Sequence, residues 1–282
     1  MKKNILITGG TSGIGFNAAK TLVKNQDNNL VLIGKNINKG ELALRKLKEI
    51  SNNKNVSFLK CDLSSLAEIN NFFKVNKFSK LDILVNNAGA VFFNKSLSKE
   101  KIEKTFALNH LGYFLFTHFV IKKNLIKKNS KIINVASGAH WGVDLDFNDL
   151  QMTKNYNGWI AYKKSKLCNI LFTKKLSQIL KKDEINVNCL HPGFVQTNFG
   201  SNNNCIITLG IRLAMKFGGI NIDEGTETLL YLIETHNKIT GEYFYKGKVS
   251  PSSNFSMSKI NADKLWKKSL EISAKYLSLI HI

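Results

Sequence analysis

The sequence predicts an α/β fold of the doubly wound type, in which a central parallel sheet of about seven strands is flanked by helices on both faces. Short runs of β-branched and apolar residues alternate with longer amphipathic patterns along the chain. No internal repeat or low-complexity linker interrupts this alternation. Alternation of this kind implies right-handed β-α-β units and a parallel sheet that is covered on both faces.

The predicted elements can be placed in order along the chain. The strands are Ile5–Thr8, Leu30–Gly34, Val56–Cys61, Ile83–Asn86, Lys131–Val135 and Asn186–Leu190, with a late strand at Tyr243–Tyr245. The helices are Gly15–Lys24, Lys39–Ile50, Leu66–Val75 and Ala161–Leu180, with a C-terminal helix at Asp263–Leu279. Ligands on such sheets bind outside the carboxyl ends of the strands, near the switch in strand order.

Length and composition favour a single soluble domain spanning 1–282, because 43% of the 282 residues are hydrophobic and 22% are charged. No apolar run reaches roughly eighteen residues, so no membrane-spanning helix is expected. The N-terminus has no signal peptide pattern, which favours a cytoplasmic location. The four cysteines form no CxxC pair, and we expect buried, reduced thiols and no metal site: Cys61, Cys168, Cys189 and Cys205.

The formal charge of +21 would suit a protein that binds nucleic acid or a membrane surface. However, the lysines are scattered through nearly every segment, and arginine occurs only at Arg45 and Arg212. We therefore interpret the charge as a Lys/Asn-rich compositional bias and expect no nucleic-acid partner. Attraction of an anionic cofactor would accompany such a charge.

A glycine-rich turn follows the first predicted strand, in the run Thr8-Gly9-Gly10-Thr11-Ser12-Gly13-Ile14-Gly15. A sharp strand-to-helix turn needs residues that tolerate positive φ, and the backbone must come close to a pyrophosphate. Glycines at 9, 13 and 15 meet both needs, and the following helix aims its amides at the anion. The turn is therefore predicted to bind a dinucleotide, through Gly9, Thr11, Ser12, Gly13, Ile14 and Gly15.

The end of the second predicted strand bears on which dinucleotide is bound. An acidic residue there would hold the adenosine ribose 2′-hydroxyl and repel a 2′-phosphate. The chain has Lys35 there and no acidic residue, and a lysine can pair with that phosphate. NADP(H) is therefore preferred, with NAD(H) as the alternative.

Tyr162 and Lys166 are four residues apart in a helical pattern and share one face of the helix. A tyrosine phenol titrates near pH 10, and a neighbouring ammonium lowers that pKa toward the range of a useful proton shuttle. The spacing alone occurs by chance. A functional interpretation of the pair is favoured because other polar residues lie in suitable places. Asn87 and Ser137 follow predicted strands, and Asn109 lies in the segment between them.

With these motifs together, the chain resembles the short-chain dehydrogenase/reductase family, and most closely its retinol dehydrogenase-like and protochlorophyllide reductase-like members. The resemblance covers about residues 4–200 and implies a Rossmann fold. It implies a catalytic tetrad of Asn109, Ser137, Tyr162 and Lys166. It also implies cofactor contacts from the glycine turn, Lys35, Asp62, Leu63, Asn87, Ala88, Gly89, Tyr162, Lys166, Pro192, Gly193, Val195 and Thr197. Ala136 departs from the retinol dehydrogenase-like pattern, which usually has a second serine there.

The resemblance also divides the predicted domain: about 1–200 for cofactor binding and catalysis, about 198–222 for a substrate lid, and 223–282 for the C-terminal helices and last strand. The apolar residues after Thr197 favour a hydrophobic carbonyl compound or alcohol as the substrate. His140, Trp141 and Phe199 are candidate pocket residues, and Trp159 is interpreted as core or pocket wall. Residues 109–126 and 161–180 could form the faces of a homodimer, as in relatives.

Two other classes of function stay open on sequence grounds. A non-catalytic, NADPH-binding regulator or scaffold could have the same fold, although the chain retains the four tetrad residues. A nucleic-acid binder driven by the net charge would show salt-sensitive binding to any duplex.

Overall fold

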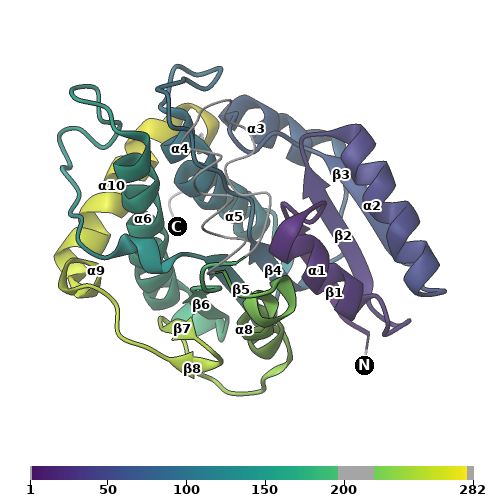
Figure 1. Ribbon diagram of the computed structural model, residues 1–282. Coiled ribbons are helices and arrows are strands. Elements are labelled where there is room, and N and C mark those ends of the chain that lie inside the picture. Colours follow the sequence, from purple (N-terminus) through teal and green to yellow (C-terminus); the bar gives the residue numbers. More distant parts are fainter. Residues whose placement is uncertain (1, 196–218, 278–282) are drawn as a thin grey trace.

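The computed structural model describes residues 2–195 and 219–277 (Figure 1). Two predicted site residues, Thr197 and Phe199, lie outside the described residues, as does the 198–218 part of the predicted lid. The described chain contains the predicted α/β architecture, with a twisted sheet between two layers of helices (Figure 1).

The sheet has eight strands in the order β3-β2-β1-β4-β5-β6-β7-β8. The strands are β1 (Asn4–Thr8), β2 (Asn29–Gly34), β3 (Val56–Lys60), β4 (Leu81–Asn86), β5 (Ile126–Val135), β6 (Asn186–Leu190), β7 (Tyr243–Tyr245) and β8 (Lys248–Val249). All neighbouring pairs from β3 to β7 are parallel, which confirms the predicted doubly wound sheet. The strand order reverses between β1 and β4.

Two details of the sheet differ from the prediction. The edge strand β8 pairs antiparallel with β7 after a tight turn in which Lys246 and Gly247 have positive φ. Two residues are too few to produce an alternating pattern, so the sequence did not indicate β8. Strand β5 begins five residues earlier than predicted, in a polar stretch where its register with β4 shifts.

The helices are α1 (Gly13–Leu22), α2 (Ile37–Ile50), α3 (Leu66–Val75), α4 (Lys104–Phe106), α5 (Gly112–Lys122), α6 (Gly158–Ile179), α8 (Ile222–Glu234), α9 (Asn254–Met257) and α10 (Lys259–Leu277). Side chains of Asn36, Ser65 and Asn157 cap α2, α3 and α6 by accepting hydrogen bonds from first-turn amides. Successive β1 side chains point to opposite cores, so Ile5 packs with α1, α2 and α8 while Leu6 packs with α3, α5 and α6. Among the helices in the described ranges, none combines the length and hydrophobicity needed to cross a bilayer.

The C-terminal helix α10 packs over α6 and α5 (Figure 1). The Trp266 ring lies 5.1 Å from the Phe114 ring and 6.1 Å from the Phe172 ring, measured between centroids. The Oγ atom of Ser269 is 2.8 Å from Nε2 of His110. The chain's own α10 therefore covers part of the two helices that were predicted as dimer faces.

Candidate active site

The predicted site residues converge at the carboxyl edge of the sheet. The glycine turn follows β1, Lys35 follows β2, Asp62 follows β3, and Asn87 follows β4. Ser137 follows β5 and Pro192 follows β6. Because these strands are parallel, their carboxyl ends share one edge, and the reversal of strand order between β1 and β4 lies at its centre.

The turn after β1 is packed directly against the loop after β4. Gly9 has φ +65°, and a Cβ atom there would lie 2.7 Å from the Cα of Ala88. A Cβ on Gly15 would lie 2.5 Å from Nδ2 of Asn87. That Nδ2 atom donates hydrogen bonds to the carbonyl oxygens of Thr8 (2.9 Å) and Gly9 (3.1 Å). Side chains are therefore excluded at both glycines, and Asn87 fixes the shape of the turn.

The start of α1 has the features of an anion-binding helix end. Its N-cap residue, Ser12, is extended and makes no side-chain capping bond, and the first turn contains no acidic residue. First-turn amides lack intrahelical partners and carry the positive end of the helix dipole. The side chain of Thr11 approaches Gly34 at the end of β2, one residue before the exposed Lys35. The start of α1 and the glycine turn fit a dinucleotide pyrophosphate.

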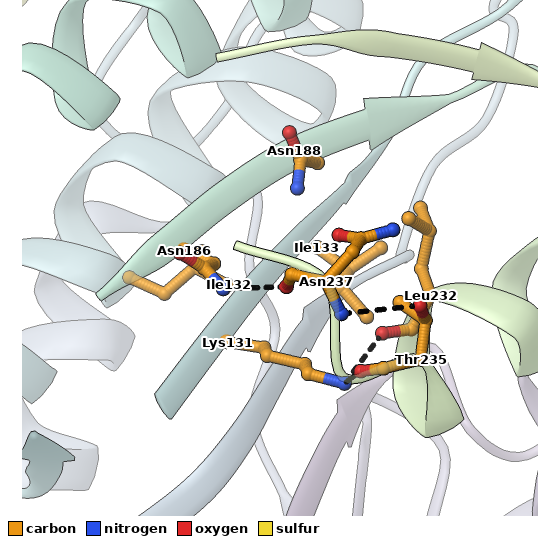
Figure 2. A pocket seen from close by; sticks show the side chains of 8 residues that line it. All are labelled: Lys131, Ile132, Ile133, Asn186, Asn188, Leu232, Thr235 and Asn237. Atoms are coloured by element: carbon orange, nitrogen blue, oxygen red, sulfur yellow. Dashed lines mark hydrogen bonds between the residues drawn. The ribbon is translucent and has the colours of Figure 1, made fainter. Parts of the chain in front are cut away.

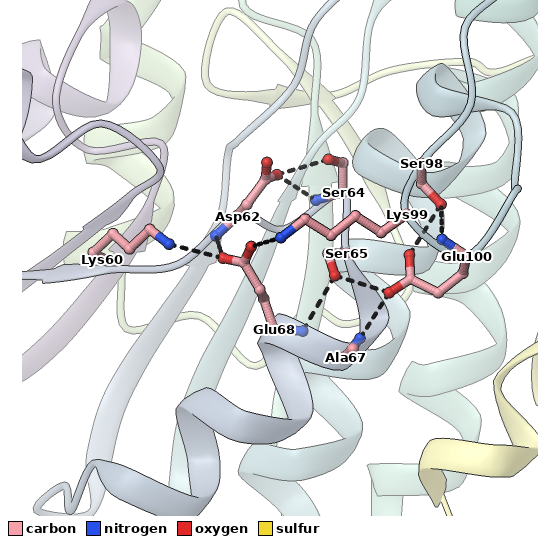
Figure 3. Close-up of polar contacts among 9 residues, drawn as sticks. All are labelled: Lys60, Asp62, Ser64, Ser65, Ala67, Glu68, Ser98, Lys99 and Glu100. Atoms are coloured by element: carbon pink, nitrogen blue, oxygen red, sulfur yellow. Dashed lines mark hydrogen bonds and ion pairs between the residues drawn. The ribbon is translucent and has the colours of Figure 1, made fainter.

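The end of β3 is held by a polar network that sequence reasoning did not predict (Figure 3). Asp62 Oδ1 accepts hydrogen bonds from the backbone N–H (2.9 Å) and hydroxyl (2.7 Å) of Ser64. The Asp62 amide donates to Glu68 Oε2, and Glu68 also pairs with Lys60 (3.1 Å) and Lys99 (2.6 Å). Partial burial acts to raise the pKa of Glu68, but the hydrogen bonds from Lys99, Lys60 and Asp62 outweigh it and lower that pKa. Glu68 thus ties the Asp62 loop to the loop that contains Lys99.

Ser137, Tyr162 and Lys166 lie together between the end of β5 and α6. The Ser137 side chain forms a hydrogen bond with Tyr162, and its Oγ also accepts one from the Ala139 amide at 3.1 Å. Lys166 Nζ lies 5.8 Å from the centre of the Tyr162 ring and donates to the carbonyl oxygen of Val135 at 2.9 Å. The structure therefore brings together the half-buried Ser137 hydroxyl, the buried Tyr162 hydroxyl and the buried amino group of Lys166.

The charge states of these groups differ from the expectation drawn from spacing. Burial raises the pKa of Tyr162 to about 12, although the hydrogen bond with Ser137 acts to lower it. Burial also lowers the pKa of Lys166 to about 7. In the protein alone, desolvation therefore dominates both groups, and the expected lowering of the tyrosine pKa by Lys166 is not found. Tyr162 is a protonated phenol at neutral pH.

Asn109 lies in a π-helical turn, Ala107–Leu111, and is fully buried. Its side chain accepts from the Ala90 amide and donates to the Ala90 carbonyl and to the Ser165 hydroxyl, each at 2.9 Å. A π-helical turn often marks a functional position because the extra residue changes which side chains face inward. Here it places Asn109 between the loop after β4 and α6, beside Gly89 and Lys166.

The two predicted pocket residues that the structure describes have different environments. His140 is fully buried: its Nδ1 lies 2.7 Å from the Ser137 carbonyl oxygen, and its Nε2 accepts from the Ser253 amide at 3.1 Å. That pairing requires a neutral ring with the proton on Nδ1. Both ring nitrogens of His140 are therefore engaged, and the ring holds the backbone at Ser137. Trp141 is 49% exposed and remains a pocket candidate.

The turn after β6 leads toward the segment outside the described residues. Gly193 has φ +92°, and its amide donates to Nδ1 of His191 at 3.2 Å. Val195 is buried and forms a parallel bridge with Ile220. Pro192 and Gly193 are thereby held at the same edge of the sheet as the glycine turn and Ser137.

The chain is similar in sequence to the members of a known protein family. A family model for short chain dehydrogenases matches residues 3–205. Human polyprenol dehydrogenase is 31% identical over 284 residues, covering 95% of this chain and 84% of that protein. Human retinol dehydrogenase 13 is 31% identical over 279 residues, covering 96% and 84%. Mouse retinol dehydrogenase 12 is 31% identical over 274 residues, covering 96% and 86%.

Solved structures show the same fold. A structure of an uncharacterised protein from Mycobacterium paratuberculosis has a TM-score of 0.78 and 24% identity, covering 96% of this chain and 93% of that chain. A variant of actinorhodin polyketide ketoreductase with NADPH has a TM-score of 0.65 and 23% identity, covering 86% and 94%. The chain therefore belongs to the short-chain dehydrogenase family of oxidoreductases, in its retinol dehydrogenase-like branch.

Proposed function

We propose that the chain is an NADP(H)-dependent oxidoreductase that interconverts a hydrophobic aldehyde, ketone or retinoid-like carbonyl and its alcohol. The catalytic residues in this proposal are Asn109, Ser137, Tyr162 and Lys166. The observation that carries it is the hydrogen bond between Ser137 and the buried Tyr162, with Lys166 Nζ beside the tyrosine ring. This group lies at the same sheet edge as the glycine turn that Asn87 holds.

The cofactor would be held by residues that already have suitable geometry. The turn from Gly9 to Gly15 and the start of α1 would bind the pyrophosphate. Asp62 Oδ1 already accepts two hydrogen bonds from Ser64, and its other carboxylate oxygen would accept a hydrogen bond from the adenine amino group. Ala88, Gly89 and the turn from Pro192 to Val195 would flank the nicotinamide, with Thr197 and Leu63 as further contacts.

NADPH is proposed over NADH because the exposed Lys35 follows β2 and no acidic residue occupies that position. Solved structures of similar fold with NADPH or NADP add support, among them the polyketide ketoreductase with NADPH and ElxO with NADP. A Lys35→Asp variant should lose about tenfold of the NADPH over NADH preference in kcat/KM. An unchanged ratio would remove Lys35 from the proposal.

When bound, NADPH supplies the hydride that reaches the carbonyl carbon. Ser137 Oγ donates a hydrogen bond to the carbonyl oxygen and polarises it where negative charge develops. Tyr162 then gives its phenolic proton to that oxygen. Because burial keeps Tyr162 protonated at neutral pH, the phenol holds the proton that carbonyl reduction requires. Lys166 would bind the nicotinamide ribose, and Asn109 would keep the Ala90 loop and α6 in register and support a proton-relaying water.

The direct test measures NADPH oxidation by the purified chain against a panel of aldehydes, ketones and quinones, with NADH in parallel. Tyr162→Phe should lower kcat by about a thousandfold, because a positioned proton donor contributes about 10²–10⁴ in rate. NADPH affinity, followed by cofactor fluorescence, should change by less than about twofold. Near-normal turnover in this variant would contradict the assignment. NADPH binding by the wild type without any turnover would favour a non-catalytic regulator.

A further inference from the structure

The first turn of α6 is held in place from three sides. The Tyr156 hydroxyl donates to the Phe92 carbonyl oxygen (2.8 Å) and lies 3.0 Å from Glu103 Oε1. The Asn157 side chain caps the helix by accepting from the Ile160 amide at 3.0 Å. A Cβ atom on Gly158 would lie 2.2 Å from the Phe92 carbonyl oxygen, so the helix start presses on that loop. These contacts fix the backbone at the start of α6, and with it the position of the residue that follows Gly158.

That next residue is Trp159, which stacks on Tyr162 one helical turn later. The two ring centroids are 5.4 Å apart and the ring planes are inclined by 20°. Tyr162 is only 8% exposed, whereas Trp159 is 41% exposed. The indole therefore has one side against the proposed proton donor and much of its remaining surface in solvent.

A single exposed aromatic side chain is common on protein surfaces, so the surroundings matter. Two other half-exposed aromatic residues follow strands at the same sheet edge: Trp141 after β5 (49% exposed) and Phe194 after β6 (48% exposed). Among the described ring contacts, Trp159 is the one of the three whose ring meets that of the proposed proton donor. An exposed indole at a binding edge offers stacking to a flat, apolar ligand and no charge to a polar one.

We infer that Trp159 is a specificity-determining residue, whose exposed indole surface stacks on a planar, apolar segment of the substrate adjacent to the carbonyl that Tyr162 protonates. The inference rests on the proposed function and adds that the enzyme selects substrates by the planarity of the group next to the carbonyl. A planar substrate gains both burial and ring stacking, an apolar but puckered one gains burial alone, and a small polar one gains neither.

The test compares kcat/KM, with NADPH, for 2-naphthaldehyde, cyclohexanecarbaldehyde and glyceraldehyde. In Trp159→Ala the ratio of the naphthyl to the glyceraldehyde value should fall by about fivefold or more, and Trp159→Phe should retain most of it. Any shared loss from a displaced Tyr162 cancels in this ratio, because all three substrates need the same proton. Tyr231→Ala, which removes an aromatic side chain of similar exposure on α8, should leave the ratio unchanged.

Trp159→Leu serves as a second variant because it keeps apolar bulk without a planar ring. It should lower the naphthyl to cyclohexyl ratio even if Trp159→Ala does not fold. An active wild type with unchanged ratios in the Trp159 variants contradicts the inference alone. A wild type that reduces none of the three carbonyls contradicts the proposed function and, with it, the inference.

Discussion

Two lysines at opposite ends of the sheet show that lowered pKa values can accompany different roles. Lys166 lies at the carboxyl edge beside Tyr162, while Lys131 pairs with Ile83 and Asn186 near the amino ends of β4 and β6. Burial lowers the pKa of Lys166 to about 7 and that of Lys131 to about 8. Titration alone would therefore place both among candidate functional residues.

Their hydrogen-bond partners separate them. Lys131 Nζ donates to the carbonyl oxygens of Leu232 (3.0 Å), Ile233 (2.9 Å) and Thr235, which end helix α8 (Figure 2). Lys166 Nζ has one hydrogen-bond acceptor among the described residues, the Val135 carbonyl oxygen. The cavity beside Lys131 has about 10 Å³, room for no more than about one water. Lys131 therefore uses its three N–H donors to cap helix α8, whereas Lys166 has N–H donors that could bind a ligand.

The largest effect that separates the two lysines is expected in turnover. Lys166→Met should lower kcat by about a hundredfold, because the proposed ribose contact is lost. Its free energy of unfolding should be unchanged or higher by about 1–2 kcal/mol, because a buried ammonium is removed while Asn169 still donates to Val135. Steady-state kinetics and denaturant unfolding check both parts. A strongly destabilised Lys166→Met would show that Lys166, like Lys131, has a structural role.

Lys131→Met should show the reverse pattern. Three carbonyl oxygens at the end of α8 lose their donor, which should lower the free energy of unfolding by about 2 kcal/mol. Turnover per folded molecule should stay within about twofold of the wild type. Lys128→Met, on the same strand but in an exposed ion pair with Glu184, is the matched control and should change stability by less than about 0.5 kcal/mol.

Because burial lowers the pKa of both lysines, the free energy of unfolding should rise with pH. Between pH 7 and 10.5 the unfolded chain holds these lysines protonated, while the folded chain holds fewer protons, so stability rises with pH. Comparison with Lys166→Met isolates one group: the wild type should gain stability relative to the variant as pH rises through this window. Unfolding curves at pH 7, 8.5 and 10 measure it. A difference that does not depend on pH would show that Lys166 titrates normally.

The smallest effect is expected for an exposed lysine. Lys99 pairs with Glu68 at 2.6 Å but is largely solvent-exposed, so Lys99→Met should lower the free energy of unfolding only slightly, and by less than Lys131→Met does. Added salt should reduce even this difference, because exposed charges are screened. A loss as large as that of Lys131→Met would mean that the Glu68 network stabilises the fold far more than a surface ion pair does.

The sequence predicted local features correctly where a conformation or an environment requires one type of residue. The glycine turn was predicted because positive φ and close backbone approach both require glycine. Gly9 has both, Gly13 has a positive φ, and Gly15 has the close approach. The parallel strands were predicted because buried strands have short apolar runs. Trp159 is three residues before Tyr162 on the predicted helix, so its stacking was also accessible from spacing, although it was interpreted only as core or pocket wall.

By itself, therefore, the sequence determined the alternation of strands and helices, the turn after β1, and the shared helix face of Tyr162 and Lys166. Only the tertiary structure decided that His140 supports Ser137 from below, that α10 covers α5 and α6, and that Lys131 caps α8. It also decided that the pKa of Tyr162 is raised. The reason is physical: periodicity and turn chemistry act between near neighbours, whereas burial and long-range hydrogen bonds depend on segments that only folding brings together.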